Sequence, residues 1–345
     1  MSDRDLQRAT LADIAGRMGV SVATVSKVVN GRDDVAAGTR ERVLEALRHA
    51  GYRSPGQRRR AELSGPMIDV VFDALNSAYS TTLLTGVLDA AASSDVDVVV
   101  SVIGSGRTAA ADLARRSQKM VERGRCGLVV ITSSYSASQL RPFRDRGLPV
   151  VVVDRMNPPP AGVVSIGATN WAGGRAAAEH LIALGHTRIA YLGGIEESDC
   201  NQARFHGFLA ALSAHGLTAP DELVLHGTFR KGFGETAGRT LLDLPAPPTA
   251  VFCGNDRIAF GLMEEARRRG IAVPDQLSVV GFDGTYEARQ SSPTLTSVTQ
   301  PLHEMGAAAL RALLQRIQGG QPGSHRVELA TELVVRESTA PAPAS

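Results

Sequence analysis

The sequence has little cysteine. Its three cysteines, Cys126, Cys200 and Cys253, are far apart in the 345 residues, and none belongs to a CxxC pair or has a histidine partner at ligand spacing. Disulfide frameworks and structural zinc sites bring several cysteines together at short, regular spacings. We therefore expect unpaired thiols in a reducing compartment, and we predict no metal site.

Long hydrophobic runs are also missing. No stretch of the sequence approaches the roughly 18 uninterrupted apolar residues that a membrane-spanning helix needs. A charged segment followed by a short apolar run, the pattern of a secretion signal, is absent as well. The sequence predicts neither export nor membrane insertion, so we expect a cytoplasmic protein without a membrane partner.

Motifs of common catalytic centres are absent too. The sequence contains no G-x-S-x-G, HExxH or Walker lysine, and its eight histidines show no nucleophile or metal spacing. The segment Gly104–Ala109 imitates a dinucleotide-binding GxGxxA, but the acid expected about 20 residues later is replaced by Thr132-Ser133-Ser134. We interpret that segment as a turn and predict a protein that is not an enzyme and binds no cofactor.

Charge, in contrast, is unevenly distributed. Residues 1–62 carry 12 Lys and Arg against 8 Asp and Glu, a net charge of +4, which leaves −2 on the remainder of a chain whose total is +2. A positively charged N-terminal segment is where phosphate groups of a nucleic acid would be attracted.

The segment Thr10–Asn30 has the pattern of a helix-turn-helix. Leu11, Ile14, Ala15 and Met18 form the apolar stripe of a first helix that Thr10 can cap. Gly19 can end this helix in the left-handed conformation, and Ser21 can cap a second one. A turn of three to four residues between two short helices is typical of DNA-binding proteins.

The second helix of this segment has two different faces. Val25, Val28 and Val29 would point inward, whereas Val22, Ala23, Thr24, Ser26, Lys27 and Asn30 would remain available to a partner. For base readout we favour Val22, Ala23 and Lys27, because apolar side chains meet thymine methyl groups and a cation meets guanine acceptors. Taken alone, the pattern also fits two ordinary surface helices.

Thr10-Leu11-x-Asp13-Ile14-Ala15 and Gly19-Val20-Ser21-Val22-Ala23-Thr24-Val25-Ser26-x-Val28-x-Asn30 resemble, without gaps, the N-terminal headpiece of the lactose and galactose repressor (LacI/GalR) family. The resemblance implies a third helix, which Thr39–Leu47 provides with Val43, Leu44 and Leu47 on one face. It begins at Ala36-Ala37-Gly38, where the family usually has a capping serine, so we expect its first turn to fray.

A linker with Pro55, Gly56 and three successive arginines follows the headpiece. The resemblance implies a hinge helix that inserts an apolar side chain into the minor groove, but Ala61 stands where that wedge belongs. We therefore expect the arginines to grip phosphates or a narrow minor groove. The full predicted DNA-binding set is Thr10, Leu11, Ser21, Val22, Ala23, Thr24, Ser26, Lys27, Asn30, Tyr52, Arg58, Arg59 and Arg60.

From Met67 onward, continuous Val- and Ile-rich runs alternate with helical stretches, a pattern that predicts parallel α/β sheets. The runs are too many for one small sheet, so we expect two doubly wound lobes with a cleft between them. Segments such as Leu184-Gly185-His186-x-Arg188-Ile189-Ala190, Asn255-Asp256 and Val280-Gly281-Phe282-Asp283 resemble the periplasmic-binding-protein type core of the same family.

These patterns divide the chain into four parts. We expect a headpiece at residues 1–53, a hinge at 54–66, a core at 67–338 and a disordered tail at 339–345. Lobe 1 would comprise 67–166 and 299–338, including a last strand Glu328–Arg336, and lobe 2 would comprise 167–298. The resemblance implies three passages of the chain between the lobes.

Ligands of open α/β sheets bind at the carboxyl ends of strands, so the residues that end each apolar run are candidates. Carboxylates, amides and an arginine beside aromatic rings suit the hydroxyls and C–H faces of a sugar. The predicted effector-binding set is Asp73, Ser77, Tyr79, Ser80, Ser133, Asp154, Arg155, Arg204, Phe229, Asn255, Asp283 and Gln300. Strand-end capping is the alternative role for each aspartate, and we expect Asp256 to be structural.

The sequence therefore predicts a repressor that binds a palindromic, double-stranded operator as a homodimer and responds to a small effector, most simply a mono- or oligosaccharide. Two alternatives remain open. The regulator could use a co-repressor such as a nucleobase, or no ligand at all, and a plain sugar-binding protein without a DNA role would need only the core.

Overall fold

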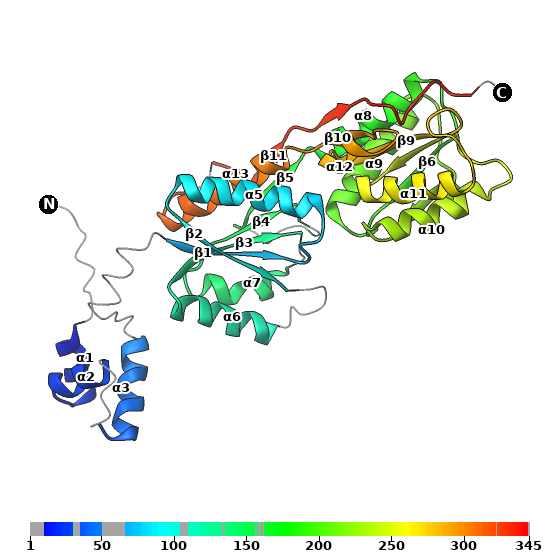
Figure 1. The fold of residues 1–345 in the computed structure, drawn as a ribbon. Helices are drawn as coiled ribbons and strands as arrows, with labels where there is room; N and C mark the ends of the chain where they lie inside the picture. Colours follow the sequence, from blue (N-terminus) through cyan, green and yellow to red (C-terminus); the bar gives the residue numbers. More distant parts are fainter. Residues whose placement is uncertain are drawn as a thin grey trace. The chain divides into compact units, whose positions relative to one another are not determined.

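The computed structural model describes residues 10–29, 35–49, 66–103, 110–132, 135–155, 157, 160, 162–321 and 323–343. The chain forms two compact units, Met1–Gly65 and Pro66–Ser345, shown as ribbons in Figure 1. Within the described ranges, no helix has both the length and the hydropathy needed to cross a membrane.

The first unit contains three short helices, α1 (Leu11–Met18), α2 (Val22–Val29) and α3 (Ala37–His49). The Thr10 hydroxyl accepts a hydrogen bond from the Asp13 amide, and the Asp13 carboxylate accepts one from the Thr10 amide at 2.7 Å. Gly19 ends α1 with φ 64°, and the Ser21 hydroxyl accepts the Thr24 amide at 3.1 Å. These caps are the ones that the sequence predicts.

The core of the first unit is small and aliphatic. It consists of Ile14, Ala15, Val25, Val28, Val43 and Leu47. The expected inward position of Leu44 is wrong, because this side chain is 42% exposed. Successive helical residues are about 100° apart, so Leu44 lies beside the narrow stripe that Val43 and Leu47 turn inward. Helix α3 also begins two residues before Thr39, and Arg40 N donates to Ala36 O at 2.9 Å.

The second unit contains two six-stranded sheets, each of which defines a lobe. The sheet of lobe 1 has the order β11-β5-β4-β3-β1-β2, and all its neighbouring pairs are parallel. Its strands are β1 (Met67–Phe72), β2 (Asp97–Val102), β3 (Arg125–Ile131), β4 (Val150–Val153), β5 (Val164–Ala168) and β11 (Arg326–Leu329).

The sheet of lobe 2 has the equivalent order β12-β10-β9-β8-β6-β7, and only its β10–β12 pair is antiparallel. Its strands are β6 (Ile189–Gly193), β7 (Val224–His226), β8 (Ala250–Cys253), β9 (Ser278–Asp283), β10 (Thr296–Thr299) and β12 (Glu332–Val334). The predicted fold class, a helix-turn-helix headpiece followed by two doubly wound lobes, is confirmed.

Helices cover both faces of each sheet. In lobe 1, α5 (Ala78–Ser93) and α13 (Leu302–Ile317) pack on one face, and α6 (Ala110–Glu122) and α7 (Ala137–Arg144) on the other. In lobe 2, α8 (Asn170–Ala183) and α9 (Asp199–Ala214) cover one face, and α10 (Lys231–Leu242) and α11 (Asp256–Arg268) the other. The short η1 (Asp221–Leu223) and α12 (Tyr286–Gln290) complete lobe 2.

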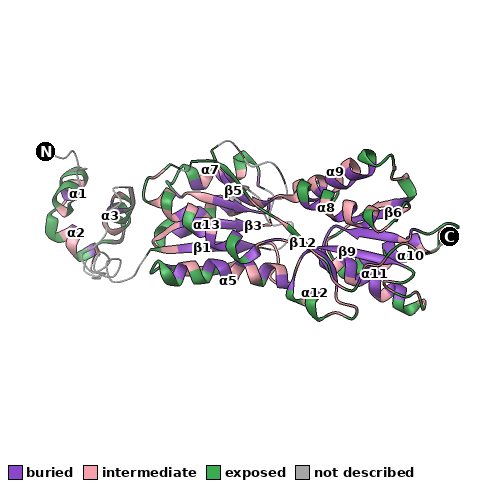
Figure 2. Cartoon of the chain, turned by 90° about the horizontal axis from the view of Figure 1, so that it is seen from above, coloured by how far each residue is buried: buried purple, intermediate pink, exposed green. Residues whose placement is uncertain are grey.

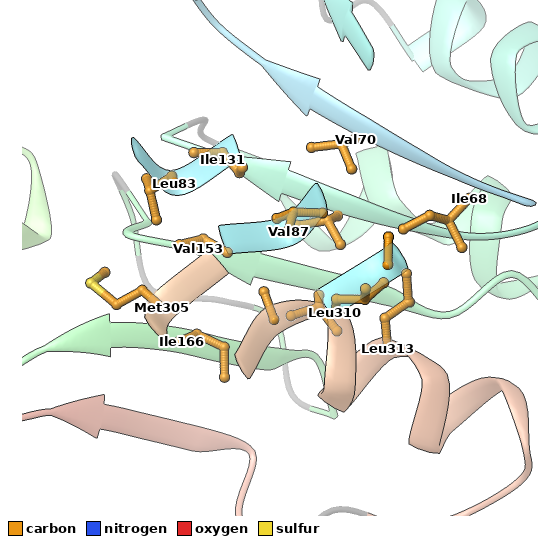
Figure 3. Packing of buried hydrophobic residues seen from close by; sticks show 14 of the residues in the cluster. Ile68, Val70, Leu83, Val87, Ile131, Val153, Ile166, Met305, Leu310 and Leu313 are labelled. Atoms are coloured by element: carbon orange, nitrogen blue, oxygen red, sulfur yellow. The ribbon is translucent and has the colours of Figure 1, made fainter. Parts of the chain in front are cut away.

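The cores lie between these layers, where the inner strands are almost entirely buried, whereas the edge strands β2, β7, β11 and β12 are half-buried or exposed (Figure 2). Side chains alternate across the sheet: Ile68, Val70 and Phe72 belong to the cluster under α5 and α13, whereas Val71 belongs to the one under α6 and α7. Figure 3 shows the first of these clusters, in which side chains of both helices meet those of the strands. Continuous burial on two faces explains the uninterrupted apolar runs of the sequence.

Three helix pairs approach each other at reciprocal glycines, one from each helix. A Cβ atom added at Gly174 of α8 would lie 2.1 Å from Arg204 O of α9, and one at Gly207 of α9 would lie 2.0 Å from Trp171 O of α8. The pairs α5–α13 and α10–α11 repeat this arrangement through Gly86 with Gly306 and Gly234 with Gly261. Glycine therefore fixes the spacing of these helices.

The chain passes between the lobes three times: from β5 to α8, from β10 to α13 and from β11 to β12. The expected single strand Glu328–Arg336 in lobe 1 is wrong, because β11 joins the first sheet and β12 the second. The break occurs at Thr331, whose amide donates to the Thr169 hydroxyl at 2.9 Å and ties two of the passages together.

The expected disorder of the tail is also wrong for residues 339–343. Ser278 and His186 both bond to the Ala340 carbonyl, at 3.1 Å each, and the Ala342 amide donates to Leu184 O at 2.8 Å. The tail thus lies beside the first residues of β9, where the Val279 amide donates to Ser338 O and the Ala340 amide donates to the Ser278 hydroxyl. The Ala, Pro, Thr and Ser residues of the tail give no sign of this order in the sequence, because hydrogen bonds of the main chain do not depend on a periodic pattern of side chains.

Candidate functional site

The outward face of α2 carries small side chains and one cation. Val22 is 47% exposed, and Ala23 and Lys27 are exposed as well, whereas Val25 and Val28 are buried in the small core. Thr24 and Ser26 lie at the border between the two faces. A short helix with small exposed residues can enter the major groove, which is about 12 Å wide.

Two residues of the predicted DNA-binding set have structural roles in α1. Thr10 is exposed and caps the helix, and its backbone and side-chain hydrogen bonds lower the pKa of the Asp13 carboxyl. Leu11 is half-buried against the core. Asn30, Tyr52, Arg58, Arg59 and Arg60 of that set lie outside the described residues, as does Ser133 of the effector set.

In the second unit, Arg204 is the centre of a polar network in lobe 2. Its side chain is only 2% exposed; Nε donates to Asn170 Oδ1 at 2.8 Å and a terminal nitrogen donates to Gly254 O at 2.6 Å. The guanidinium lies 3.8 Å from the centre of the Phe282 ring and 6.0 Å from that of Phe229. Burial opposes its charge, but its neighbours Cys200, Asp283, Asp154 and Tyr191 together raise the pKa of Arg204.

Asp283 lies beside Arg204 at the end of β9. A terminal nitrogen of Arg204 is 3.8 Å from Asp283 Oδ1, which also accepts a hydrogen bond from Gln300 Nε2 at 2.8 Å. Burial raises the pKa of the Asp283 carboxyl well above its ordinary value, and the charge of Arg204 acts against that rise. The Gln300 side-chain oxygen is buried without a hydrogen-bond partner, so it can still accept a hydrogen bond from a ligand.

Lobe 1 contributes a second pair of polar residues. The Tyr79 hydroxyl donates to Asp154 Oδ2 at 2.7 Å, and burial together with the Asp154 charge raises the pKa of Tyr79. Asp283 and Cys200 of lobe 2 also raise this pKa, and Asp154 raises that of Asp283. These four residues therefore share one electrostatic environment at the junction of the lobes.

Three of the four non-glycine residues with positive φ among those described lie at the carboxyl ends of strands, and the fourth, Asp95, precedes β2. Thr132, Asp154 and Asp283 have φ of 50°, 45° and 107°, values that residues with a Cβ rarely adopt. Each follows or ends a strand at its carboxyl edge. Strained conformations of this kind persist where the surrounding structure holds them, and they cluster at ligand sites.

Other predicted effector residues are engaged locally. Ser77 caps α5 by accepting the Ser80 amide, and the Ser80 hydroxyl donates to Ala74 O. Asn255 caps α11 through the Ile258 amide, and its side-chain nitrogen donates to Phe229 O. Asp73 is half-buried after β1. These hydrogen bonds are local and do not involve Arg204, Asp283 or Gln300.

Asp256 has the structural role that we expected. It is fully buried, and it accepts hydrogen bonds from the amide and hydroxyl of Thr285 and from Ser297. Burial raises the pKa of its carboxyl to about 6, against these hydrogen bonds, which lower it. It thereby joins three segments of lobe 2: the start of α11, the residue before α12 and strand β10.

Arg155 spans the lobes. Its Nε donates to Asp199 Oδ2 at 2.7 Å, which connects the end of β4 in lobe 1 with the start of α9 in lobe 2. A cavity of about 460 Å³ lies at this ion pair, lined by Asp154 and Arg155, by β5 and the start of α8, by one face of α9 and by β11. No group of three or more metal-ligating side chains occurs among the described residues.

Sequence reasoning missed several residues of this region. Asn170, Asp199, Cys200 and His206 line the cavity, and Asn170 also orients Arg204. The pattern of strand ends could not reveal them, because they lie on helices. The positions 199, 200, 203 and 206 are spaced as one face of a helix, which is a usable signal once α9 is known to face the cleft.

Comparison with known proteins identifies the family. Residues 10–54 match the model for bacterial regulatory proteins of the lacI family, and residues 178–339 match the periplasmic binding protein-like domain. The chain is 31% identical to the HTH-type transcriptional repressor CytR of Escherichia coli (strain K12), over 97% of each chain. The chain belongs to the LacI family. It is a DNA-binding transcriptional repressor, and its relatives in this family are regulators rather than enzymes.

Solved structures of LacI-family proteins agree with this assignment. The complex of the transcriptional regulator CelR with cellobiose is 29% identical with a TM-score of 0.71, and covers 96% of this chain and 100% of CelR. The lac repressor dimer bound to operator and the anti-inducer ONPF is 26% identical with a TM-score of 0.71, and covers 97% of this chain and 100% of that one.

Proposed function

We propose that this repressor binds a two-fold symmetric operator as a homodimer, and that a small polyhydroxylated effector in the cleft controls operator affinity. The observation that carries the proposal is a pair of polar groups at the junction of the lobes, Tyr79 with Asp154 in lobe 1 and Arg204 with Asp283 and Gln300 in lobe 2, whose charges act on each other. A ligand there contacts both lobes at once, so its binding free energy depends on how the lobes are placed.

The polar groups of this network suit hydroxyls. Asp154 and Asp283 offer acceptors, Arg204 and Gln300 offer donors, and Phe282 and Phe229 flank the guanidinium. A sugar hydroxyl can donate and accept at the same time, which lets it replace the hydrogen bonds that these side chains now make to one another. A sugar is the effector class that this chemistry favours.

Control of DNA binding requires that the effector prefers one arrangement of the lobes. The lobes are connected by the Arg155–Asp199 ion pair and by the three passages of the chain. A change in lobe closure would act through these connections. In a homodimer such a change alters the distance between two headpieces. A palindromic operator is sensitive to that distance because its half-sites have fixed spacing.

The exposed face of α2 supplies the proposed base contacts, through Val22, Ala23 and Lys27. The homodimer is proposed by analogy with the lac repressor, whose operator complex contains a dimer. A symmetric protein pairs naturally with a palindromic site.

Selection of bound sequences from a pool of randomised double-stranded DNA tests this function. We expect the full-length protein to enrich a palindrome, and we expect Lys27→Ala to relax the preference at one position of each half-site by about 1–3 kcal/mol. An enriched sequence without two-fold symmetry would contradict the homodimer. An unchanged preference in the variant would remove Lys27 from the readout.

A ligand screen completes the test. Thermal shift of the full-length protein with mono- and disaccharides, and separately with nucleobases and nucleosides, distinguishes the sugar effector from a nucleobase co-repressor. We expect stabilisation by sugars, because a ligand that binds only the folded state raises its stability by mass action. Stabilisation by the nucleobase panel alone would contradict a sugar effector.

A further inference from the structure

Asn201, in the first turn of α9, is fully buried, and its hydrogen bonds fix the orientation of its side-chain amide. Oδ1 accepts hydrogen bonds from the Gly194 amide and from the Tyr191 hydroxyl, at 2.9 Å each. Because a backbone amide can only donate, the side-chain atom that faces Gly194 must be the oxygen. The side-chain nitrogen Nδ2 therefore faces Nδ1 of His226, at 3.1 Å.

This contact is compatible with only one protonation state of His226. Nδ2 of Asn201 carries two hydrogens and can only donate, so Nδ1 of the histidine ring must accept and Nε2 carries the proton of the neutral ring. A protonated ring carries a hydrogen on each nitrogen, and its Nδ1–H would point at the Nδ2 hydrogens. Asn201 cannot turn its amide over in response, because its nitrogen would then face the Gly194 amide, donor against donor.

Two successive glycines at the end of β6 make room for this pair and connect it with an aromatic side chain. A Cβ atom added at Gly193 would lie 2.4 Å from His226 Nδ1, and one added at Gly194 would lie 2.2 Å from the ring of Phe229. The amide of Gly227, the residue after His226, also donates to Gly194 O at 3.1 Å. The pair therefore supports, on two sides, the residue against which Phe229 packs.

The surroundings of His226 keep its ring neutral near pH 7. The ring of Tyr191 in β6 lies 5.7 Å away, and burial raises the pKa of its hydroxyl, which stays neutral. The ring of Phe205 in α9 lies 5.3 Å away and carries no charge. Burial lowers the pKa of His226, and the charges of Glu196 and Glu197 in the loop after β6 act against this lowering. Protonation of the folded protein at this ring therefore requires a pH below about 6.5.

We propose that Asn201 and His226 are positioning residues of the effector site and make that site sensitive to pH. While the ring is neutral, the pair holds residues 194–198 and, through them, Phe229, which flanks the guanidinium of Arg204. The protonated ring is repelled by Asn201 Nδ2 and attracted by the carboxylates of the loop, so residues 194–198 lose a support and the effector is bound more weakly. The consequence for the effector rests on the proposed function, but the structural change needs no ligand.

Hydrogen exchange of the full-length protein without ligand, followed by mass spectrometry, tests this inference. Exchange rates divided by the intrinsic rates at each pH give protection factors for residues 194–198. We expect the protection of wild type to fall about three- to tenfold between pH 7.5 and pH 5, the range that corresponds to the loss of one hydrogen bond. In His226→Gln the side-chain oxygen is an acceptor that does not titrate, so the protection should not fall.

Asn201→Asp gives the sharpest comparison, because it replaces the donor by an acceptor of the same shape. The carboxylate can still accept from the Gly194 amide, and its second oxygen stabilises protonated His226. We expect the fall in protection to disappear, and we expect an NMR titration of the imidazole ring to show a higher pKa for His226 than in wild type. His215→Gln, at an exposed position at the end of α9, is the matched control and should behave as wild type. Thermal denaturation verifies that each variant is folded.

The outcomes separate this inference from the proposed function. Protection of wild type that does not change with pH would overturn the inference, and so would a fall that persists in His226→Gln or in Asn201→Asp. None of these results involves a ligand, so each leaves the sugar effector untouched. Failure of every sugar to bind wild type at pH 7.5 would contradict the sugar effector and leave the hydrogen-exchange result standing.

Discussion

The two lobes of the core share one topology but differ in how they hold polar groups. Both sheets have the same strand order, and each receives its last strand from the C-terminal part of the chain. The core of lobe 1 under α5 and α13 is dominated by aliphatic side chains, whereas lobe 2 contains a cluster of Tyr191, Phe208, Phe252 and Phe282 with ring centres about 5 to 6 Å apart. The aromatic core of lobe 2 supports the buried guanidinium of Arg204.

This difference suggests a division of roles between the lobes. In lobe 2, Arg204, Asp256 and Asp283 are buried and fixed by several partners each, so their geometry exists before a ligand arrives. In lobe 1, Tyr79 and Asp154 are fixed mainly by one hydrogen bond to each other. Preorganised groups determine orientation at little entropic cost, and we infer that lobe 2 selects the effector while lobe 1 responds to it.

The largest expected effect comes from removing the buried cation of lobe 2. Arg204→Met leaves the buried Asp283 without its arginine, and breaking a buried ion pair costs roughly 3–5 kcal/mol. Urea denaturation followed by circular dichroism measures the loss. Arg175→Met, at an exposed position on the neighbouring helix α8, is the control and should change stability by less than about 0.5 kcal/mol. Equal losses of stability in both variants would mean that the buried Arg204 contributes no more to the stability of lobe 2 than an exposed arginine does.

The glycine contacts allow the two lobes to be compared directly. Gly174→Ala in lobe 2 and Gly86→Ala in lobe 1 each place a methyl group about 2 Å from a backbone oxygen of the partner helix, and overpacking of this kind costs about 1–3 kcal/mol. Only the lobe 2 variant displaces the backbone of Arg204. We expect both variants to lose stability, but only Gly174→Ala to lose effector affinity as well.

Gly232→Ala is the control for that pair, because nothing lies within 4 Å of the added atom. The three proteins are compared by calorimetric titration with an effector and by chemical denaturation. If Gly86→Ala weakened effector binding as much as Gly174→Ala, the assignment of selectivity to lobe 2 would be wrong.

A smaller effect is expected for the polar pair of lobe 1. Tyr79→Phe removes the hydroxyl that bonds to Asp154. A hydrogen bond to a charged group contributes about 1.5–3 kcal/mol when nothing replaces the lost donor. Because Asp154 also faces the cavity, water can replace the hydroxyl, and we expect a loss near 1 kcal/mol or less. Denaturation midpoints measure it, and a loss as large as that of Arg204→Met would remove the distinction between the lobes.

The smallest effect concerns two histidines. His186 of lobe 2 is buried; since the Ala340 carbonyl can only accept, Nε2 carries the proton and Nδ1 accepts from Thr249. Burial lowers the pKa of His186. As the pH falls, His186 is therefore protonated in the unfolded chain before it is protonated in the folded protein. The stability contributed by neutral His186 is present above a pH of about 6.5 and is lost as the pH falls below that value.

We expect a decline in the stability of wild type between pH 7 and 5.5 that is reduced in His186→Asn. His303 of lobe 1 pairs with Asp89 on the exposed surface, and His303→Asn is the control that should leave the decline unchanged. Denaturation midpoints at a series of pH values give the comparison. A decline that persists in His186→Asn would assign it to other groups.

The sequence predicts the fold well because the determinants of the fold are local. Thr10, Gly19 and Ser21 cap helices within three residues of themselves, and the apolar runs of the inner strands predict burial on both faces, although the Val-rich edge strand β2 is partly exposed. The site is predictable where it coincides with strand ends, as at Asp154 and Asp283. It is not predictable at Asn170 or Asp199, whose roles arise only when α8 and α9 pack at their glycines.

The errors have a similar cause. The division of residues 326–336 between two sheets depends on the bond between Thr331 and Thr169, and the ordered tail depends on hydrogen bonds of its main chain to the Leu184 carbonyl and the Ser278 hydroxyl. These contacts join residues more than 60 positions apart in the sequence. Periodicity reports the neighbours of a residue along the chain, and it carries no information about such partners.

Operator affinity measured with and without effector tests the central claim most directly. Fluorescence anisotropy would follow the full-length protein on its selected palindrome at fixed salt, because affinity for DNA depends strongly on ionic strength. The account predicts that a saturating effector changes operator affinity at least about tenfold, roughly 1.4 kcal/mol of coupling, while binding to unrelated DNA changes much less. An effector that binds the core but leaves operator affinity unchanged would contradict it.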